Sequence, residues 1–412
     1  MSSSPIALCE DPDVHEGPAI FSGLHSGPSL DAHRQQYGDV PRVSLDELTA
    51  ATDGTGLRGR GGAAFPFAVK LRAAADGSRR PVVVVNLSEG EPASSKDSAL
   101  ARTRPHLVLD GAVATARALG AHAVHVVLPG DRPLTVAAMD AAMAERHDRR
   151  VRLVRHVAAP RFVAGQARAV LELMAGRPNL PVTAWTPEAV AGHRSRPTLL
   201  SNAETWAHVG RLLHTGPPDG LGTDDEPGTT LLTLRLPGSR VSVREVQYGA
   251  SLRSLLPAKD DAAVLLGGFH GTWTTARAAR RLRVSVPGFR EAGCALGAGL
   301  VLAVDDCPVA WTQRIVAYLA GQSARRCGPC LNGLPALAEA VSAIDDGTGT
   351  ARVEQLAGLV ERRGACAHPD GTVRLVRSLL TAYPDEIDRH GAGHCAWTRP
   401  ATVVRRLRSV AS

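Results

Sequence analysis

The sequence predicts an α/β protein in which a larger α/β domain precedes a small α+β module and a helical C-terminal region. Three observations favour this class. Continuous apolar segments such as Val82–Asn86 alternate with helical patterns up to residue 214, which is typical of a mainly parallel sheet buried on both faces. A stretch rich in Gly, Pro and Asp follows at 215–227. Short strands come next, and the pattern turns helical from Pro308.

Each element rests on the spacing of its apolar residues, which is continuous or alternating in strands and three to four residues in helices. The α/β part has expected strands at 82–86, 123–128 and 151–157, and expected helices at 106–119, 134–146, 163–174 and 203–214. The small module has expected strands at 229–236, 241–246, 262–266 and 299–304, with a helical piece at 252–257. The last region has expected helices at 309–322, 334–344, 353–362 and 372–383.

Composition excludes several classes of protein. The 412 residues are 44% hydrophobic and 21% charged, which predicts two to four globular domains. The net charge of +7 is spread along the chain, so nucleic-acid binding is not expected. No apolar run approaches the roughly 18–20 residues that span a bilayer, so no membrane insertion is expected. The polar first 17 residues lack a signal-peptide core, which predicts a frayed leader and a cytoplasmic protein.

A glycine-dense run at 56–66 carries the strongest chemical signal. It precedes a helical pattern that contains Lys70, one of only three lysines in an arginine-rich chain. A turn of glycines lets backbone N–H groups approach a phosphate, and the start of a helix adds positive potential. The run therefore predicts a site for a phosphate-bearing cofactor.

The cysteines predict a metal or cluster site near the C-terminus, because their odd number, seven, argues against a disulfide framework. Cys327 and Cys330 lie between the first and second C-terminal helices, and Cys366 lies between the third and fourth. In an up-down bundle these connections share one end, so the three thiols converge. Converging thiolates bind zinc or an iron–sulfur cluster, and the alternative is three ordinary buried cysteines.

Three thiols are one ligand short of the usual four. The local candidates for a fourth ligand are His368 and Cys307, whereas Cys395 lies beyond the last expected helix. His368 follows Cys366 by two residues and is expected to be a polar loop residue.

Several motifs in one order carry a resemblance over roughly residues 50–385. The chain resembles the FMN- and NADH-binding subunit of respiratory complex I and its relatives in formate dehydrogenases and NAD-reducing hydrogenases. The family motif G-L-R-G-R-G-G-A-G-F-P is met at 56–66, with Ala64 in place of a glycine. The motifs N-A-D-E-G-E-P-G-x-x-K-D and P-T-x-x-N-N-V-E-T are met, with a few departures, at 86–97 and 197–205.

The resemblance implies the cofactors and the site residues. FMN is the expected flavin, NAD(H) the substrate, and an iron–sulfur cluster the acceptor of single electrons. Phe65 would stack on the dinucleotide and Glu91 would bind it. The implied cofactor-binding residues are Gly59, Arg60, Gly61, Gly62, Phe65, Lys70, Asn86, Glu89, Glu91, Asn202 and Thr205, and the implied cluster ligands are Cys327, Cys330 and Cys366.

Four departures from the family pattern bear on activity. Ala324 stands where the motif C-G-x-C-x-P-C has its first cysteine, so three thiolates would hold a [4Fe-4S] cluster with a foreign fourth ligand or a [3Fe-4S] cluster. Gln166 and Ala167 replace two glutamates beside flavin and nicotinamide, Ser88 replaces an aspartate, and Ala73 replaces an aromatic residue. The flavin phosphate site is kept, while the nicotinamide side and the cluster are altered.

The resemblance implies five segments and a function. We expect an N-terminal leader at 1–49, a Rossmann-like FMN- and NAD-binding α/β domain at 50–220, a β-grasp, ubiquitin-like module at 228–306, an iron–sulfur four-helix bundle at 307–390 and a basic tail at 391–412. The expected function is an NADH dehydrogenase-like oxidoreductase that passes electrons between NAD(H) and a ferredoxin-like carrier or partner subunit. The alternatives are a degenerate structural subunit of an electron-transfer assembly, and an FMN-dependent reductase that uses NADPH or reduced ferredoxin.

Overall fold

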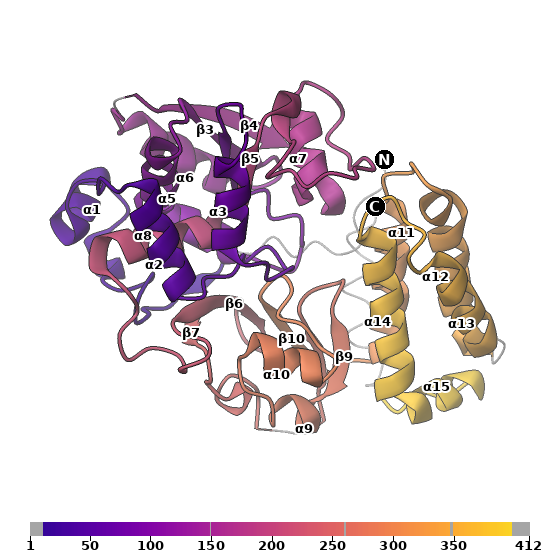
Figure 1. Ribbon diagram of the computed structural model, residues 1–412. Helices are drawn as coiled ribbons and strands as arrows, with labels where there is room; N and C mark the ends of the chain where they lie inside the picture. Colours follow the sequence, from indigo (N-terminus) through magenta and orange to yellow (C-terminus); the bar gives the residue numbers. More distant parts are fainter. Residues whose placement is uncertain (1–10, 149, 259–260, 347–348, 398–412) are drawn as a thin grey trace.

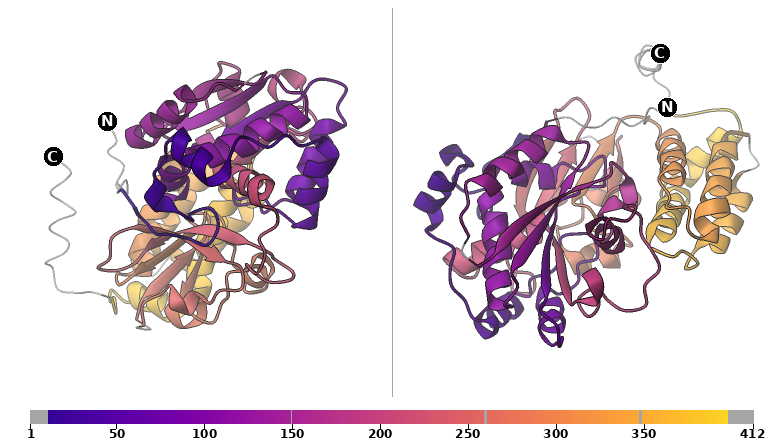
Figure 2. Two further views of the ribbon diagram at one scale, coloured as in Figure 1. Left: turned by 90° about the vertical axis from the view of Figure 1, so that its left-hand side faces the viewer. Right: turned by 90° about the horizontal axis from the view of Figure 1, so that it is seen from above.

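The computed structural model describes residues 11–148, 150–258, 261–346 and 349–397. Figure 1 shows an α/β part at the upper left, a β-sheet module below it and a group of helices at the right. Seen from above, the helices stand to one side of the α/β part (Figure 2). The predicted fold class is confirmed, whereas Cys9 and the tail at 398–412 lie outside the described residues.

Within the described residues, the α/β part is built on a four-stranded parallel sheet in the order β4-β3-β2-β5. The valines of β2 are fully buried, as expected of a covered parallel strand. The strands are β2 (Val82–Asn86), β3 (Ala123–Pro129), β4 (Arg152–Ala158) and β5 (Thr198–Asn202), and the helices are α3 (Phe67–Ala75), α4 (Lys96–Thr103), α5 (Pro105–Ala118), α6 (Pro133–Ala144), α7 (Ala167–Met174) and α8 (Ala203–Thr215), with a 3₁₀ turn η3 (His193–Ser195) before β5.

The helix predicted at 163–174 is interrupted. A 3₁₀ turn, η2 (Phe162–Gly165), ends at Gln166, whose backbone is extended with φ −66° and ψ 140°. α7 begins at the next residue. The interruption places Gly165 and Gln166 in a turn instead of inside a helix, and both take part in the site described below.

The frayed leader predicted for the first 17 residues is wrong for residues 11–17, and residues 18–49 of the expected leader segment are ordered as well. β1 (Asp13–Val14) pairs with the second sheet, and η1 (Leu24–Ser26), α1 (Leu30–Tyr37) and α2 (Leu45–Gly54) follow it. Ile20 and Phe21 are fully buried. The polar composition concealed this order because much of the segment is held through its backbone N–H groups.

The second sheet has six strands in the described part of the chain, in the order β1-β7-β6-β10-β8-β9. β10 pairs with β6 in parallel, whereas the pairs β6–β7, β8–β10 and β8–β9 are antiparallel. Its elements after β1 are β6 (Thr229–Arg235), β7 (Ser242–Gln247), η4 (Leu252–Ser254), β8 (Ala263–Leu266), β9 (Thr272–Thr275), α9 (Ala276–Ala279), α10 (Val286–Glu291) and β10 (Leu300–Val304). β9, α9 and α10 were not predicted because each is six residues or fewer.

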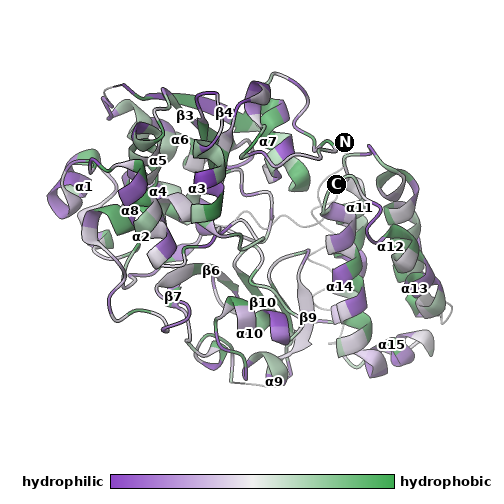
Figure 3. Ribbon diagram, in the orientation of Figure 1, coloured by the Kyte–Doolittle hydropathy of each residue, from purple (hydrophilic) through white to green (hydrophobic). Residues whose placement is uncertain are grey.

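The helical part contains the four predicted helices and a further one, α15, which Pro384 starts directly after α14. Its elements are α11 (Pro308–Gly321), a π-helical turn η5 (Pro329–Gly333), α12 (Leu334–Ser342), η6 (Ala343–Asp346), α13 (Gly349–Val360), α14 (His368–Ala382) and α15 (Pro384–Gly391). Figure 3 shows hydrophobic and hydrophilic residues alternating along α14, as expected of a helix that covers a core with one face. Among the described residues, no helix has the length and hydropathy needed to cross a bilayer.

Three glutamates join the parts by accepting hydrogen bonds from backbone N–H groups of another part. Glu204 on α8 accepts from a backbone N–H of β6 at 2.8 Å. Glu245 on β7 accepts from the N–H groups of residues 19–21 at 2.9–3.0 Å. Glu91, before α4, accepts from Phe269 between β8 and β9 at 2.7 Å. The parts are therefore joined by specific hydrogen bonds in addition to apolar packing.

Candidate functional site

The carboxyl ends of β2 and β5 form the centre of the candidate site. β3 and β4 lie on one side of β2, and β5 lies on its other side, so the strand order reverses between β2 and β5. Ligands of open α/β sheets bind at such a reversal, beyond the carboxyl ends of the strands. Asn86 and Asn202 end these two strands and are paired in register. The two asparagines predicted for the site therefore lie side by side.

The glycine loop is closed on itself and tied to α8. The backbone N–H of Gly59 donates to the carbonyl of Phe65 at 2.8 Å, and that of Arg60 donates to the hydroxyl of Thr205 at 2.9 Å. The next residues, 61–63, are exposed. Across the described residues no protein acceptor takes their backbone N–H groups, so these donors are available to an anion.

Three residues of this loop, Gly56, Gly62 and Ala64, have a left-handed backbone. Gly62 has φ 101°, which glycine adopts without strain. Ala64 has φ 49°, at the position where the family motif has glycine, and a residue with a Cβ costs about 1–2 kcal/mol in this region. The loop packs closely against the end of β5: a Cβ added at Gly61 would lie 3.7 Å from the Cβ of Asn202.

The side chain of Arg60 reaches the second sheet. Its guanidinium donates to the carbonyl of Thr229 at 3.0 Å and to the hydroxyl of Tyr248, and its Nε lies 3.6 Å from Glu204. The arginine predicted to bind the cofactor thus fixes the position of the loop. The glycine N–H groups remain as the donors for a phosphate.

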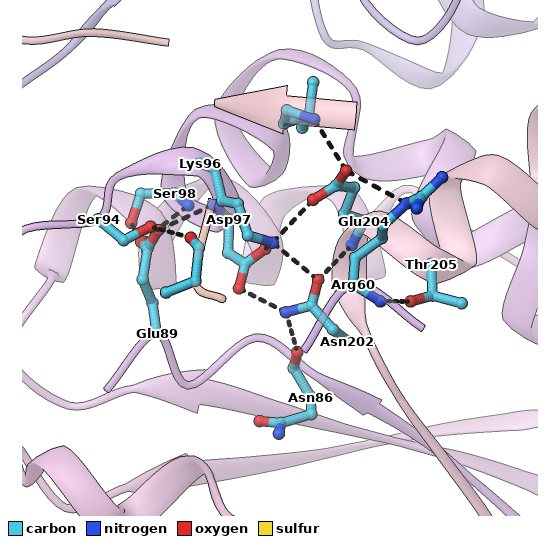
Figure 4. A network of polar contacts seen from close by, with 12 residues as sticks. Arg60, Asn86, Glu89, Ser94, Lys96, Asp97, Ser98, Asn202, Glu204 and Thr205 are labelled. Carbon is cyan, nitrogen blue, oxygen red and sulfur yellow. Dashed lines mark hydrogen bonds and ion pairs between the residues drawn. The ribbon is translucent and has the colours of Figure 1, made fainter. Parts of the chain in front are cut away.

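A buried charged network behind the loop contains residues that the sequence analysis did not assign to the site (Figure 4). Nζ of Lys96 lies 2.9 Å from Asp97 and 2.9 Å from Glu204, and it donates to Oδ1 of Asn202 at 3.0 Å. Nδ2 of Asn202 donates to Asp97 at 2.6 Å, so the orientation of this amide is fixed. The rarity of lysine and the matched motif at 86–97 were signals that pointed to Lys96.

The neighbouring charges set the protonation states in this network. Burial lowers the pKa of Lys96, but Asp97 and Glu204 more than offset this and raise it above its ordinary value. Burial raises the pKa of Glu204, but Lys96, His208 and Arg60 hold it well below its ordinary value. Burial raises the pKa of Asp97 to about 6. A fixed cation therefore lies directly behind Asn202.

Glu89 is used within the protein. Its carboxylate accepts from the backbone N–H groups of Asp97 at 2.9 Å and Ser98 at 3.0 Å, at the start of α4, and lies 2.9 Å from Arg132. A carboxylate in this position stabilises the N-terminus of a helix. The residue predicted to line the flavin site thus positions the helix that carries Lys96.

Asn86 connects the crevice with the turn before α7. Its Nδ2 donates to the carbonyl of Gly165 at 2.7 Å, and its Oδ1 accepts from the hydroxyl of Ser88 at 2.7 Å. A Cβ added at Gly165 would lie 2.5 Å from that hydroxyl. Ser88, which replaces an aspartate of the motif, therefore orients Asn86 in a tightly packed corner.

Three predicted residues lie at the rim of the crevice. Phe65 is 46% exposed, so one face of its ring is open to a planar ligand. Nζ of Lys70 donates to Glu188 at 3.2 Å and to a carbonyl of β5 at 3.3 Å. Burial raises the pKa of Glu91 to about 7, and its carboxylate is occupied by Phe269. Phe65 and Lys70 are thus placed for a ligand, whereas Glu91 holds the second sheet.

These residues fit FMN. A phosphate requires unpaired N–H groups with a cation nearby; residues 61–63 offer the N–H groups, and Lys96 lines the same recess as Gly62 and Ala64. Asn86 and Asn202 stand at the carboxyl ends of the two strands, where the ligand of an open α/β sheet binds. A recess beside the loop is bounded by Gly62, Ala64, Lys96, Gly297 and Gly299.

The three predicted cluster ligands converge. The thiol of Cys330 contacts that of Cys327 and lies close to Cys366, and burial together with these neighbours raises its pKa to about 11. Cys330 lies in the π-helical turn, a feature frequent at functional sites. The three described sulfurs are not all within 4.8 Å of one another, so they are spread more widely than the ligands of a single ion.

Gln166 links the flavin crevice to the thiols. Its side chain contacts the thiol of Cys366, while the carbonyl of Gly165 accepts from Asn86. Nearby, the ring of Phe162 lies 4.5 Å from that of His270 and 5.6 Å from that of His368, between centroids. The three parts of the protein thus meet where the two sites adjoin.

None of the suggested fourth ligands joins these thiols. His368 is fully buried in the first turn of α14, where Nε2 contacts the carbonyl of Leu319 at 2.8 Å, so its expected place in a loop is wrong. Cys307 and Cys395 lie together elsewhere, with His390. Ala324 is buried next to Arg325, whose backbone N–H donates to the sulfur of Cys330.

Two family models match the chain in tandem. The model described as the Nuo51 FMN-binding domain matches residues 53–211. The model described as the NADH-ubiquinone oxidoreductase-F iron–sulfur binding region matches residues 310–390. The first contains the glycine loop and both asparagines, and the second contains the three converging cysteines.

Relatives match over most of the chain. An F-type NADH-quinone oxidoreductase subunit of Rhizobium meliloti (strain 1021) is 28% identical over 93% of this chain and 97% of its own length. NADP-reducing hydrogenase subunit HndC of Solidesulfovibrio fructosivorans is 26% identical over 82% of this chain and 74% of its own. The crystal structure of an NAD+-reducing [NiFe]-hydrogenase in the air-oxidized state contains a chain with the same fold, with a TM-score of 0.79, 23% identity and coverage of 97% of this chain and 71% of that one.

Proposed function

Because the chain belongs to the family of F-type NADH-quinone oxidoreductase subunits, which are FMN- and iron–sulfur-containing oxidoreductases, we propose that it passes electrons between NAD(H) and a small carrier or partner subunit. Relatives named as subunits of a quinone oxidoreductase and of a hydrogenase support a partner protein as the other redox party. We place the protein in the cytoplasm, as the sequence predicts.

The observation that carries this proposal is the continuity between the two cofactor sites. Gly165 accepts a hydrogen bond from Asn86 at the crevice, and the adjacent Gln166 contacts Cys366 at the thiols. One short turn therefore borders both sites. A flavin and a cluster held at these two places would be near neighbours, which electron transfer between them requires.

The residues divide the work between binding, orientation and charge. When bound, FMN supplies hydride acceptance from a nicotinamide and single-electron release to a cluster. Residues 61–63 would bind the phosphate, and Asn86 and Asn202 would orient the ring. Lys96 stays cationic and holds the Asn202 amide in one orientation. Phe65, exposed at the rim, would stack on the dinucleotide.

Anaerobic reduction tests the proposal. The purified chain is expected to release one FMN per chain on denaturation, and its flavin absorbance is expected to bleach with NADH. A matched variant, Asn202→Ala, removes one ring-orienting amide and is expected to lower FMN content, whereas the exposed Asp388→Asn on α15 is not. FMN that bleaches with dithionite but not with NADH or NADPH would contradict the nicotinamide half of the proposal.

A structural subunit that has lost NADH activity is the second candidate. The observation that favours it is the acid-free turn at Gln166 and Ala167, where the family has two glutamates. FMN well below one per chain together with no bleaching by either nicotinamide would support this candidate. Faster bleaching by NADPH than by NADH would instead support the NADPH-dependent reductase.

A further inference from the structure

A second group of metal-ligating side chains lies at the opposite end of α11 from the converging thiols. Their ligand atoms all lie within 4.8 Å of one another. Cys307 of this group directly precedes α11, whereas Cys327 and Cys330 follow it, and a helix of 14 residues is about 21 Å long. The two groups are therefore separate sites. The members of this group are Cys307, Glu386, His390 and Cys395.

The topology of the helical part brings these residues together. Cys307 comes directly before α11, at the junction with β10 of the second sheet. α14 starts beside Cys366 and runs back along α11, so α15 begins near the start of α11. Glu386 and His390 are four residues apart on α15 and share one of its faces.

His390 is oriented as a metal ligand would be. Its Nδ1 lies 2.7 Å from the carboxylate of Asp345, which accepts only, so Nδ1 carries the proton. With Nδ1 on that carboxylate, Nε2 faces the sulfur of Cys307 at 3.1 Å and Oε1 of Glu386 at 3.4 Å. A carboxylate on the far nitrogen of a ligating histidine is a recurrent feature of zinc sites.

The group is partly buried and rich in groups that favour a cation. Cys307 is 4% exposed and Glu386 is 2% exposed. Arg389 lies 3.1 Å from Oε2 of Glu386, while Oε1 accepts from the backbone N–H of Ala396 at 3.0 Å and faces Nε2 of His390 at 3.4 Å. Two thiols, an imidazole lone pair and a buried carboxylate oxygen thus point at one small volume. Soft sulfur and imidazole ligands select zinc over magnesium or calcium.

We propose that Cys307, Glu386, His390 and Cys395 bind one zinc ion in a closed, four-ligand site separate from the iron–sulfur ligands. Zinc lies about 2.3 Å from sulfur and about 2.0–2.1 Å from nitrogen, so tetrahedral ligand atoms are roughly 3.3–3.8 Å apart, close to the separations in this group. The ion ties α15 and the segment after it to the junction of the second sheet with α11. This proposal does not depend on the flavin.

A comparable group elsewhere does not support a metal. His33, Asp110 and His214 also have ligand atoms within 4.8 Å of one another. There, however, the guanidinium of Arg146 lies 2.7 Å from Asp110 and supplies the positive charge. In the zinc group Arg389 pairs with Oε2 of Glu386 at 3.1 Å, but among the described residues no hydrogen bond or ion pair joins an arginine to the side chain of His390 or Cys307.

Metal analysis of the full chain tests the proposal. Protein purified without chelators and desalted is expected to contain one zinc per chain in addition to its iron. His390→Ala and Cys395→Ser are expected to remove the zinc and leave the iron unchanged. Cys294→Ser is the matched control, because Cys294 is equally buried but lies in the second sheet with only a carbonyl as partner.

A readout on the unaltered protein guards against variants that fail to fold. Exchange of the bound metal for cobalt is expected to give a thiolate-to-cobalt charge-transfer band and tetrahedral d–d bands. A wild-type chain with zinc at background, no cobalt bands, or a Cys307–Cys395 disulfide found by peptide mass spectrometry would overturn the proposal. Loss of zinc in the Cys294→Ser control would do the same.

Discussion

The two thiol groups of the helical part differ in ligand type, spacing and surroundings. Cys327, Cys330 and Cys366 offer sulfur alone, are spread more widely than the ligands of one ion, and border the flavin crevice. The group at the start of α11 mixes sulfur, imidazole and carboxylate within 4.8 Å and lies far from the flavin. The number of cysteines in a group therefore does not show which metal or cluster the group binds. What distinguishes a group that holds an electron-carrying cluster from one that holds a structural ion is the spacing of its ligands and its position relative to the flavin site.

The largest expected effect comes from removing one of the converging thiols. Cys330→Ser leaves two thiolates, which cannot hold a cluster of three or four irons. Iron is expected to fall to background by elemental analysis, while zinc stays at one per chain. Simultaneous loss of both metals in a folded variant would show that the two groups are not independent.

Restoring the missing ligand is expected to have the next largest effect. Position 324 precedes the N–H that donates to the sulfur of Cys330, so a thiol there would lie beside the cluster. Ala324→Cys is expected to raise iron to four per chain and to convert a [3Fe-4S] EPR signal, seen after oxidation, into a [4Fe-4S] signal after reduction. Ala324→Ser is the control and should change neither. Iron at background in both variants would contradict the cluster.

A smaller effect is expected from the carboxylate behind His390. Asp345→Asn weakens the acceptor for Nδ1–H and with it the orientation of the imidazole. Removal of such an outer partner lowers metal affinity by roughly 10–100-fold. Competition with a chromogenic chelator measures this affinity, and the exposed Asp388→Asn on the same helix as His390 is the control. Equal zinc affinity in Asp345→Asn and wild type would contradict the assigned tautomer.

The smallest effect is expected at two strained backbone positions, one at each cofactor site. Ala64 and Arg325 have φ 49° and 54°, and the family motifs have glycine at both. Substitution by glycine relieves about 1–2 kcal/mol of strain, and the greater freedom of glycine in the unfolded chain offsets about 0.5–1 kcal/mol. Ala64→Gly and Arg325→Gly are each expected to raise the free energy of unfolding by about 0.5–1 kcal/mol in chemical denaturation.

The opposite change serves as the control for that pair. Gly62 has φ 101°, so Gly62→Ala is expected to lower the free energy of unfolding. A neutral result for all three variants would mean that these turns relax without cost. The strain would then explain nothing about the divergence of this chain from its family.

Apolar periodicity predicted the sheets and the long helices because burial and helix or strand geometry are local properties. It missed β9, α9 and α10 in the second sheet and, in the α/β part, β5 and α4. It also missed the order of residues 11–49, where Glu245 holds three backbone N–H groups that no side-chain pattern encodes.

The motifs located the flavin crevice but not the direction of each side chain. Asn86 and Asn202 are paired as expected, whereas Arg60 and Glu89 turn towards protein partners. The other end of the bundle also brings distant residues together, as the connections at Cys327 and Cys366 do. The sequence did not predict that convergence because α15, which carries His390, was not predicted.

The glutamates that join the α/β part and the N-terminal segment to the second sheet have a consequence for anyone who wishes to dissect the chain. A fragment ending in the linker at 215–227 would retain Glu204 and Lys96 but lose the β6 N–H that Glu204 binds. A fragment beginning there would expose Glu245 without residues 19–21. Each buried charge left without its partner costs roughly 3–5 kcal/mol, which is comparable with the stability of a small domain. Expression of isolated modules, or exchange of modules between relatives, therefore requires these carboxylates and the N–H donors that they bind to be transferred together.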